Sequence, residues 1–596
     1  MKLKTVLQNN FYMLKNILRY CPSQIVVSIV NALLGSAVSV LNILLLKFVI
    51  DSITNPASFT KTVFFICANA AVALAQSAVS SFLSSVVIPR NTQVLQQKMQ
   101  MDMFRKAVAV ELKCYEDTSF YNQFTMALQQ AESRALAVLQ TFTALLSSVF
   151  SIGALAALVI TFEPAVLGVI CVCVTVSFIL NLRYIQVQHD YVEKSVPINR
   201  ELSYVKRVFY LEDYAKELRY SHIPGVLKNM FDHSVKEAIE LIRTYGLKFA
   251  LLSFFRNSSN VLGSMGIMIY LAQQVFWQKS SVGDFTAMVS SSQQLTSQLI
   301  SFLGTFPQLY EHSLYIKHYR AFMEYQPQIE QNESGIRVPA AFDLCVENIS
   351  FRYTEDRGDV LKNVTIRIRH QEKVAFVGRN GSGKTTMVKL ITRLYDPNEG
   401  RLLINDKPYT AYQLTSLRES IGVMFQDYHY FALSVAENVL LRGVRQECRD
   451  EDEKIVTNAL KVCGLYEKVV SLPEGIYTKL SREFSDGGTF LSGGELQKLA
   501  LARIYANQCS LIILDEPSSA LDPMSEKALF DAMLETGRDK TVIMISHRLA
   551  NIKNVDRVYL FDEGEVLEEG SHQELMTKNG RYAAMYRLQA EQYRDN

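Results

Sequence analysis

Charged residues are distributed very unevenly along the chain. Between residues 23 and 89 the only charged side chains are Lys47, Asp51 and Lys61, and between residues 285 and 310 there is none. Beyond about residue 340, by contrast, a charge occurs every few positions. The pattern therefore predicts a membrane-embedded first half and a water-soluble second half. It excludes a purely soluble enzyme and a secreted disulfide scaffold.

Six stretches are apolar over the roughly 20 residues that a helix needs to cross about 30 Å of hydrocarbon. Two long connections separate them, at 90–139 and 184–246, and both are rich in Lys and Arg. The positive-inside bias places these connections and both termini in the cytoplasm. Their helical composition predicts two hairpins that each reach about 35 Å at about 1.5 Å per residue. The predicted spans are about 24–47, 62–89, 140–162, 165–183, 247–274 and 284–307.

The predicted sixth span is unusually polar. A run of serine and glutamine extends through it and includes Ser291, Gln294 and Gln298. Because unpaired polar groups in hydrocarbon are costly, this face either lines a water-filled cavity or makes hydrogen bonds to neighbouring helices. Arg256 in the fifth span poses a similar choice, between contact with a substrate and a position at the edge of the bilayer.

Length and composition narrow the function classes. At 596 residues the chain is too long for one ordinary domain of about 150 residues. A net charge of +2 argues against a nucleic-acid binder, and the nine cysteines show no metal-like spacing. No cleavable signal peptide is evident. Because the first histidine is His189, we expect no Cys–His peptidase domain ahead of the membrane part.

The soluble half contains a predicted phosphate-binding loop. A short buried strand at 373–377 runs into nine residues that fit the pattern G-x4-G-K-[ST]. In such a loop, glycines let backbone N–H groups converge on phosphate oxygens, and the following helix adds its positive N-terminus. We expect Lys384 to reach the β- and γ-phosphates and Thr385 to ligate Mg²⁺. The nine residues are Gly378, Arg379, Asn380, Gly381, Ser382, Gly383, Lys384, Thr385 and Thr386.

A second apolar strand, at 511–514, ends in two acidic residues. Asp515 is expected to hold Mg²⁺ through water, and Glu516 to orient and deprotonate the water that attacks the γ-phosphate. The alternative is a buried strand that ends in two solvated acids. The phosphate loop upstream favours the catalytic interpretation, so the predicted cofactors are ATP and Mg²⁺.

Further motifs give the chain a specific resemblance to the ATP-binding-cassette (ABC) transporters. Leu491-Ser492-Gly493-Gly494-Glu495 resembles the cassette signature, although the family more often has glutamine where Glu495 stands. The resemblance implies that Ser492, Gly493 and Gly494 bind the γ-phosphate held by a second subunit. Glu495 adds a negative charge near that composite site, with little expected effect on hydrolysis.

Five single residues match other positions of the cassette. Gln426 matches the Q-loop glutamine, which ligates the metal, and Asp522 matches the D-loop aspartate. His547 matches the switch histidine that donates to the γ-phosphate, and Tyr353 matches the aromatic that stacks on adenine. Asp486 lies where exporters carry a loop that senses the membrane domain.

The resemblance implies the exporter architecture over essentially the whole chain. The expected fold is multi-domain: an all-α polytopic membrane domain of six transmembrane helices (ABC exporter fold) followed by an α/β P-loop ATPase domain. The implied parts are an interfacial elbow helix at 1–22, a membrane domain at 23–325, a linker at 326–342 and a cassette at 343–596. One cassette completes no site alone, so a second half-transporter is required. A homodimer is favoured and a heterodimer stays open.

The hairpin tips resemble the coupling helices of exporters, each of which rests on a cassette. The alternative at both tips is a solvated loop. These tips and Leu499–Arg503 look most like bacterial lantibiotic and peptide exporters, which favours export of a peptide across the cell membrane by alternating access. A multidrug or lipid exporter and an ATP-driven ligand sensor or resistance module without net transport stay as alternatives. The candidate coupling residues are Tyr115, Glu116, Asp117, Glu212, Asp213 and Tyr214.

Overall fold

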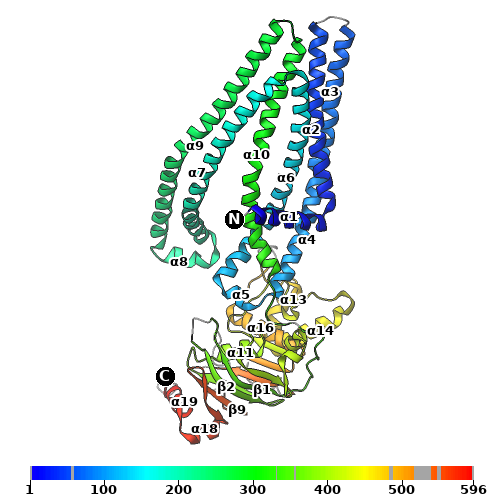
Figure 1. Ribbon diagram of the computed structural model, residues 1–596. Helices are drawn as coiled ribbons and strands as arrows, with labels where there is room; N and C mark the ends of the chain where they lie inside the picture. Colours follow the sequence, from blue (N-terminus) through cyan, green and yellow to red (C-terminus); the bar gives the residue numbers. More distant parts are fainter. Residues whose placement is uncertain are drawn as a thin grey trace. The chain divides into compact units, whose positions relative to one another are not determined.

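The chain forms two compact units, and each is described by itself. The computed structural model describes residues 3–54, 59–330, 332–354, 358–481, 488–515, 539–546 and 552–592. The helical unit comprises Met1–Ala109 and Thr118–Tyr325, and the nucleotide-binding unit comprises Val110–Asp117 and Gln326–Asn596 (Figure 1). A short piece of the first half, around α5 (Leu112–Glu116), therefore belongs with the second unit.

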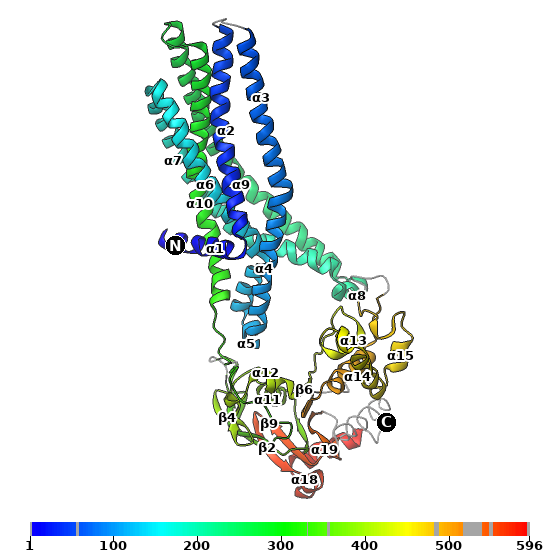
Figure 2. The same cartoon turned by 90° about the vertical axis from the view of Figure 1, so that its right-hand side faces the viewer.

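Long helices make up the helical unit. α3 continues into α4 through one π-helical turn at Leu83–Val87, so the two form one rod. α7 and α9 run alongside each other and are joined at one end by α8, which both views show (Figures 1 and 2). The helices are α1 (Leu3–Tyr20), α2 (Pro22–Thr54), α3 (Phe59–Phe82), α4 (Ile88–Ala109), α6 (Thr118–Phe162), α7 (Ala165–Tyr210), α8 (Ala215–Tyr220), α9 (Ile223–Phe276) and α10 (Val282–Glu324).

Four helical rods in the described residues are long and apolar enough to cross a membrane. They are α2, the α3–α4 rod, α6 from Ser133 and α7. α9 and α10, which carry the predicted fifth and sixth spans, have 54 and 43 residues but no stretch as apolar as those four. The serine and glutamine run explains the shortfall in α10. Apolarity alone therefore supports four spans, while helix length accommodates all six.

The first helix is amphipathic and lies across the direction of the long helices (Figures 1 and 2). Met13 and Ile17 on one face are fully buried, whereas Phe11 on the other is 67% exposed. Two buried asparagines fix α1 to α10: the Asn9 side-chain amide donates to the Ser313 hydroxyl at 3.0 Å, and that of Asn10 donates to the Leu309 carbonyl at 2.8 Å. α1 therefore joins α10 through polar side chains and buries an apolar face.

Two sheets organise the nucleotide-binding unit. The larger has the order β10-β9-β3-β8-β7-β6, and the smaller is antiparallel with the order β2-β1-β4-β5. β3 runs parallel to β8 and β9, and β7 runs parallel to β6 and β8. The strands are β1 (Leu344–Phe351), β2 (Leu361–Ile368), β3 (Lys373–Gly378), β4 (Glu399–Ile404), β5 (Lys407–Pro408), β6 (Ile421–Met424), β7 (Leu511–Asp515), β8 (Thr541–Ile545), β9 (Arg557–Asp562) and β10 (Glu565–Gly570).

The central strands β7 and β8 are buried over their whole length, which explains their continuous apolar runs. Because they are parallel to β3, their carboxyl ends meet at one edge of the sheet, where α/β proteins bind ligands. Within its described residues, the α-helices of this unit are α5, α11 (Lys384–Ile391), α12 (Leu414–Glu419), α13 (Val435–Leu440), α14 (Arg449–Val462), α15 (Tyr466–Val470), α16 (Gly493–Ala506), α18 (His572–Lys578) and α19 (Arg581–Gln592).

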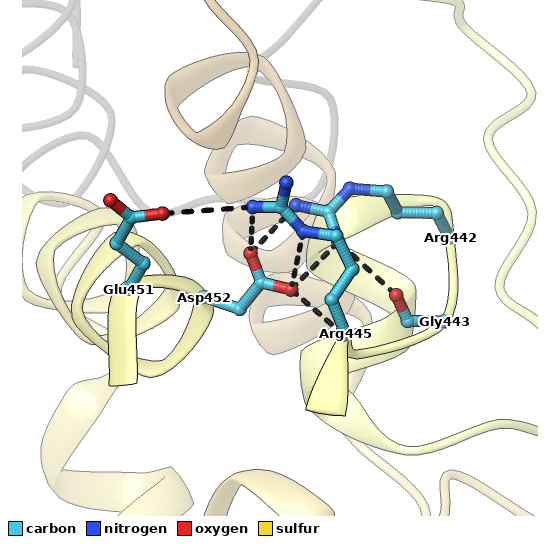
Figure 3. Close-up of polar contacts among 5 residues, drawn as sticks. All are labelled: Arg442, Gly443, Arg445, Glu451 and Asp452. Atoms are coloured by element: carbon cyan, nitrogen blue, oxygen red, sulfur yellow. Dashed lines mark hydrogen bonds and ion pairs between the residues drawn. The ribbon is translucent and has the colours of Figure 1, made fainter. Parts of the chain in front are cut away.

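A buried carboxylate holds the loop between α13 and α14 (Figure 3). Asp452, in the first turn of α14, is fully buried. It accepts hydrogen bonds from the guanidinium groups of Arg442 and Arg445, at 2.7–2.8 Å, and from the Arg445 backbone N–H at 3.0 Å. These bonds hold the pKa of Asp452 far below its usual range. The carboxylate therefore stays ionised and locks the loop onto the helix.

Candidate nucleotide site and membrane cavities

The phosphate loop joins the end of β3 to the start of α11. Its backbone needs glycine: Gly378 has φ +146°, and a Cβ there would collide with the Phe561 carbonyl of β9. Gly383 has φ +102°, and its Cβ would lie 2.5 Å from a methyl of Leu361. The loop therefore packs tightly against β9 and β2. A loop of this kind, followed by a helix N-terminus, offers its backbone N–H groups to a phosphate.

Lys384 and Asp515, the two charged residues expected around the phosphates and Mg²⁺, lie at the start of α11 and the end of β7. The Lys384 ammonium donates to the carbonyls of Gly378 and Arg379 at 3.0 and 2.8 Å. The Thr385 hydroxyl donates to the Asp515 carboxylate at 3.0 Å, which joins α11 to the end of β7. A hydroxyl and a carboxylate placed together are hard oxygen donors of the kind that Mg²⁺ prefers. The residues present therefore fit the predicted metal.

A cavity of about 400 Å³ opens beside the loop. Gln426, which follows β6, lines it together with Val360. None of its described lining residues comes from the signature around Ser492. The loop residues that line it are Asn380, Gly381, Gly383, Lys384, Thr385 and Thr386. The cavity thus brings together the phosphate loop and the Q-loop glutamine of one chain.

Tyr353 stands in a cluster of aromatic and cationic side chains. Its hydroxyl lies 3.1 Å from that of Thr386 on α11. Tyr395 meets its ring edge-on, with centroids 5.3 Å apart, and the Lys389 ammonium lies 5.1 Å from its centre. The predicted adenine-stacking residue is therefore held in place by α11 and by the segment that follows it.

Glu116 of α5 completes this cluster within the nucleotide-binding unit. Its carboxylate accepts a hydrogen bond from the Tyr395 hydroxyl at 2.5 Å and pairs with Lys389 at 2.9 Å. Burial and this hydrogen bond raise the pKa of Tyr395 well above its usual range. Burial tends to lower the pKa of Lys389, but the contacts with Glu116 and Tyr353 outweigh it and the pKa is raised. Sequence reasoning missed Tyr395 and Lys389, because neither belongs to a motif.

The other predicted coupling residues lie at the two hairpin tips. Tyr115 is 39% exposed at the end of α5, and Asp117 is the residue that ends this helix. The first tip is therefore Leu112–Glu116, shifted from the expected turn, because Thr118 already begins α6. At the second tip, Asp213 and Tyr214 are exposed in a single 3₁₀ turn at Glu212–Tyr214, and the side chain of Glu212 lies outside the described part.

The signature forms the N-terminus of α16. Ser492 caps the helix, its hydroxyl accepts from the Glu495 N–H, and the Glu495 carboxylate accepts from the Ser492 N–H at 2.7 Å. Lys468 pairs with the same carboxylate at 3.6 Å. Burial raises the pKa of Glu495, but the bonds from Ser492 and Lys468 outweigh it and the pKa is lowered. Gly493 and Gly494 start the helix, so their N–H groups lie at its positive end.

Tyr428 connects this signature to the segment after the Q-loop glutamine. Its hydroxyl donates to the Gly493 carbonyl at 3.2 Å. Arg503 adds a second connection, since its guanidinium donates to the carbonyls of His429 and Asn438 at 2.6 and 2.9 Å. Neither contact was predicted, because each joins residues about 65 positions or more apart. Four predicted residues, Glu516, Asp522, His547 and Asp486, lie outside the described residues.

α10 has polar cavities on two sides within the helical unit. One, of about 370 Å³, lies between α10, α2, α3 and α6, and Gln294 and Gln298 line it. Both amides take part in hydrogen bonds between helices: Ser39 of α2 donates to Gln294 at 2.8 Å, and Ser148 of α6 donates to Gln298 at 3.2 Å. On this side, the polar face both pairs with neighbouring helices and lines a cavity.

The second cavity, of about 510 Å³, lies between α7, α9 and α10, and Arg256 lines it. Its other polar lining residues are Asn257, Asn260, Ser264, Ser292, Gln293, Thr296 and Ser297. Ser291 is fully buried, and it is not among the described residues that line either cavity. The structure therefore separates the candidates: Arg256 faces one cavity, and Gln294 and Gln298 face the other.

Comparisons with known proteins place this geometry in context. Residues 361–519 match the ABC transporter family. The subtilin transport ATP-binding protein of Bacillus subtilis is 28% identical over 80% of this chain and 77% of its own length. The nisin transport ATP-binding protein of Lactococcus lactis subsp. lactis is 26% identical over 95% of this chain and 90% of its own length. The ATP-dependent lipid A-core flippase of Chromohalobacter salexigens is 37% identical, but over only 45% and 44% of the two chains.

A solved structure extends the likeness to the whole fold. The bacterial Atm1-family ABC exporter with ATP bound superposes with a TM-score of 0.77 at 21% identity, over 96% of this chain and 99% of its own. The predicted fold class is thereby confirmed. The chain therefore joins a helical membrane domain with the fold of the ABC exporters to an ABC transporter ATPase domain, whose ATP hydrolysis is coupled to transport.

Proposed function

We propose that this exporter moves a peptide of the lantibiotic kind out across the cytoplasmic membrane. The observation that carries the proposal is the extent of the likeness. The subtilin and nisin transport proteins align with 80% and 95% of the chain, membrane helices included, whereas the lipid A-core flippases align with 44–59% of it. Cargo is recognised by the membrane helices, so likeness in that half bears most on substrate.

The polar cavities support the same cargo class. Amide and hydroxyl side chains around Gln294 and Gln298 offer hydrogen bonds of the kind that a peptide backbone requires. A lipid with long acyl chains is better suited by an apolar lining. A multidrug exporter of the same architecture is the second candidate, because the same amide and hydroxyl groups also suit an amphipathic drug.

The proposed ATP cycle assigns roles to this chain's residues. The phosphate loop and Lys384 hold the β- and γ-phosphates, Tyr353 stacks on adenine, and Glu516 orients and deprotonates the attacking water. Thr385, Asp515 and Gln426 would hold Mg²⁺, which supplies charge neutralisation at the phosphates. Ser492, Gly493 and Gly494 would serve the site of a second subunit, His547 would donate to the γ-phosphate, and Asp522 would add the D-loop carboxylate. Two copies of this chain, with termini and cassettes in the cytoplasm, form the proposed transporter.

Transport by inside-out membrane vesicles tests the proposal. Vesicles containing this chain alone are expected to accumulate a fluorescent lantibiotic-like peptide when ATP is added, and vesicles with Glu516→Gln are not. Accumulation of a hydrophobic dye but not of peptide would replace peptide export with drug efflux. ATP hydrolysis that peptides stimulate without any accumulation would instead identify a sensor. Absence of hydrolysis in the well-folded wild type would contradict a homodimer.

A further inference from the structure

One cavity of the helical unit carries a cation without an acidic partner. Arg256 of α9 is half-buried and lines the 510 Å³ cavity between α7, α9 and α10. Its guanidinium lies 5.8 Å from the centre of the Tyr184 ring on α7. Within the described part of the chain it forms no ion pair, and the described lining residues include no Asp or Glu. A cation in a membrane helix is costly unless an anion or water accompanies it.

The remaining lining groups favour an anion. The Asn260 side-chain oxygen already accepts a hydrogen bond from the Ser177 hydroxyl at 2.8 Å, which turns its NH₂ donors away from that contact. The amides of Asn257 and Gln293 and the hydroxyl of Ser297 line the same space, and among the described residues none of these groups forms a hydrogen bond. One guanidinium with several amide and hydroxyl donors matches an oxyanion, and its planar fork fits the two oxygen atoms of a carboxylate.

Arg256 belongs to the predicted fifth span, 247–274, in the half nearer to residue 247. Arg256 lies about 30 Å along α9 from its end at Phe276, at about 1.5 Å per residue. Asn260 lies one turn closer to that end. On α10, Gln293 and Ser297 are four positions apart and so share one face, which is distinct from the face that carries Gln294 and Gln298. The two cavities thus differ in charge: one offers neutral hydrogen-bonding groups, the other a cation.

We infer that the Arg256 cavity binds a carboxylate of the cargo peptide, while the neutral cavity contacts its uncharged parts. The inference rests on the proposed peptide export and deepens it, because it makes a carboxylate a determinant of cargo choice. Arg256 is then a specificity residue that distinguishes peptides with a carboxylate from peptides without one.

Three matched probes test the inference on the full-length protein in lipid nanodiscs. The first is a synthetic 20-residue peptide without Asp or Glu and with an amidated C-terminus. The second is the same peptide with a free C-terminal carboxylate, and the third keeps the amide but carries one Gln→Glu change. The readout is the peptide concentration that gives half-maximal stimulation of ATP hydrolysis, normalised to the maximum of each variant.

For the wild type, this concentration is expected to be about tenfold lower for the two peptides that carry a carboxylate than for the first peptide, which carries none. In Arg256→Gln the three peptides should agree within about twofold, and Arg256→Lys should retain part of the preference because it keeps the charge but loses the planar fork. Arg243→Gln is the matched control, since Arg243 lies on the same helix, is exposed and lines neither cavity. It should retain the full preference.

The outcomes separate the inference from the proposed function. If all three peptides stimulate the wild type equally, the carboxylate site is overturned while peptide export stands, and this comparison needs no variant to fold. If no peptide stimulates hydrolysis or is transported, peptide export fails and the carboxylate site with it. If anionic lipid in the nanodisc raises the melting temperature of the wild type but not of Arg256→Gln, and the peptides act equally, Arg256 holds a lipid phosphate and the inference is overturned.

Discussion

Glu495 stands where ABC transporters more often have glutamine, and neighbouring groups hold its extra negative charge. Its carboxylate closes a capping box with Ser492 and pairs with Lys468. The hydrogen bonds that lower the pKa of Glu495 keep it ionised at neutral pH. They also engage its carboxylate oxygens at the start of α16. The negative charge is therefore tied down by its own helix terminus.

Glu495→Gln should accordingly change little. The glutamine oxygen accepts the same bond from the Ser492 N–H, and the lost pair with Lys468 is partly exposed and worth about 0–1 kcal/mol. We expect a maximal rate of ATP hydrolysis within about twofold of wild type. Glu495→Ala removes the box and should cost roughly 1 kcal/mol of stability, seen as a lower melting temperature. A large loss of hydrolysis in Glu495→Gln would instead give the charge a direct role in the composite site.

Asp452 provides a prediction about pH. Because its pKa is lowered in the folded protein, its contribution to stability is complete above the pKa of an unfolded aspartate, about 3.9, and is lost as the pH falls below that value. Asp452→Asn should therefore lower the melting temperature by a few degrees at pH 7. The gap between wild type and variant should stay constant from pH 7 to about pH 5 and shrink below about pH 4.

Asp450→Asn is the matched control for Asp452. Asp450 lies in the same first turn of α14, so both variants lose the same favourable charge at the helix N-terminus, but Asp450 is exposed. Thermal unfolding of the full chain in detergent across this pH range measures both. Equal losses in the two variants would show that the helix terminus, rather than the two arginines, accounts for the effect.

At the scale of elements, α5 is a five-residue helix anchored in the nucleotide-binding unit. Leu112 packs against the buried apolar cluster that contains Phe351 and Val374. The Glu111 carboxylate accepts the Ile329 N–H at 2.9 Å, which connects α5 to the segment that enters this unit. Glu116 then contacts the residues around Tyr353. α5 is therefore placed to respond to what occupies the adenine position.

Glu116→Gln tests this connection. The amide keeps a weaker acceptor for Tyr395 but loses the ion pair with Lys389, so we expect ATP hydrolysis without peptide to change less than about threefold while peptide stimulation falls more strongly. The measurement compares hydrolysis rates with and without a saturating peptide. Glu419→Gln, an exposed acid on α12, should leave both rates unchanged. Equal stimulation of wild type and Glu116→Gln would show that this carboxylate only fixes α5 in place.

The elements that follow from local sequence were predictable, and the contacts between distant segments were not. The phosphate loop was found because its glycines, lysine and threonine are adjacent, and the buried strands because their residues are continuously apolar. Glu116 and Tyr395 are 279 positions apart, and nothing in a single sequence indicates that they meet. The predicted first hairpin tip lies a few residues too late, because its aromatic and acidic composition does not reveal that Leu112 packs against the apolar cluster.

At the scale of the whole helical unit, the first and last long helices are joined by the few charges that α2 carries. Asp51 accepts hydrogen bonds from the Ser281 hydroxyl at 2.7 Å and from the Gly283 N–H at 3.1 Å, so it caps α10 from outside. Lys47, one turn earlier on α2, pairs with Asp284 at 2.7 Å. These charges lie in a span that is otherwise free of them, and together they hold the start of α10 against the end of α2.

These contacts predict that Asp51 contributes to the stability of the folded chain, although it lies near a loop. Asp51→Ala leaves the Ser281 hydroxyl and the Gly283 N–H without their acceptor, which should cost about 1–3 kcal/mol and lower the melting temperature of the full chain by several degrees. Lys61→Ala is the control, because Lys61 is an exposed charge near the start of α3 with no recorded ion pair in the described residues. It should leave the melting temperature unchanged.

Because α10 lines both polar cavities, loss of its cap should also raise the half-saturating peptide concentration. If Asp51→Ala lowers the melting temperature but leaves the peptide response unchanged, Asp51 contributes only to stability. If Asp51→Ala and Lys61→Ala have equal effects, the role of Asp51 as a cap of α10 is contradicted.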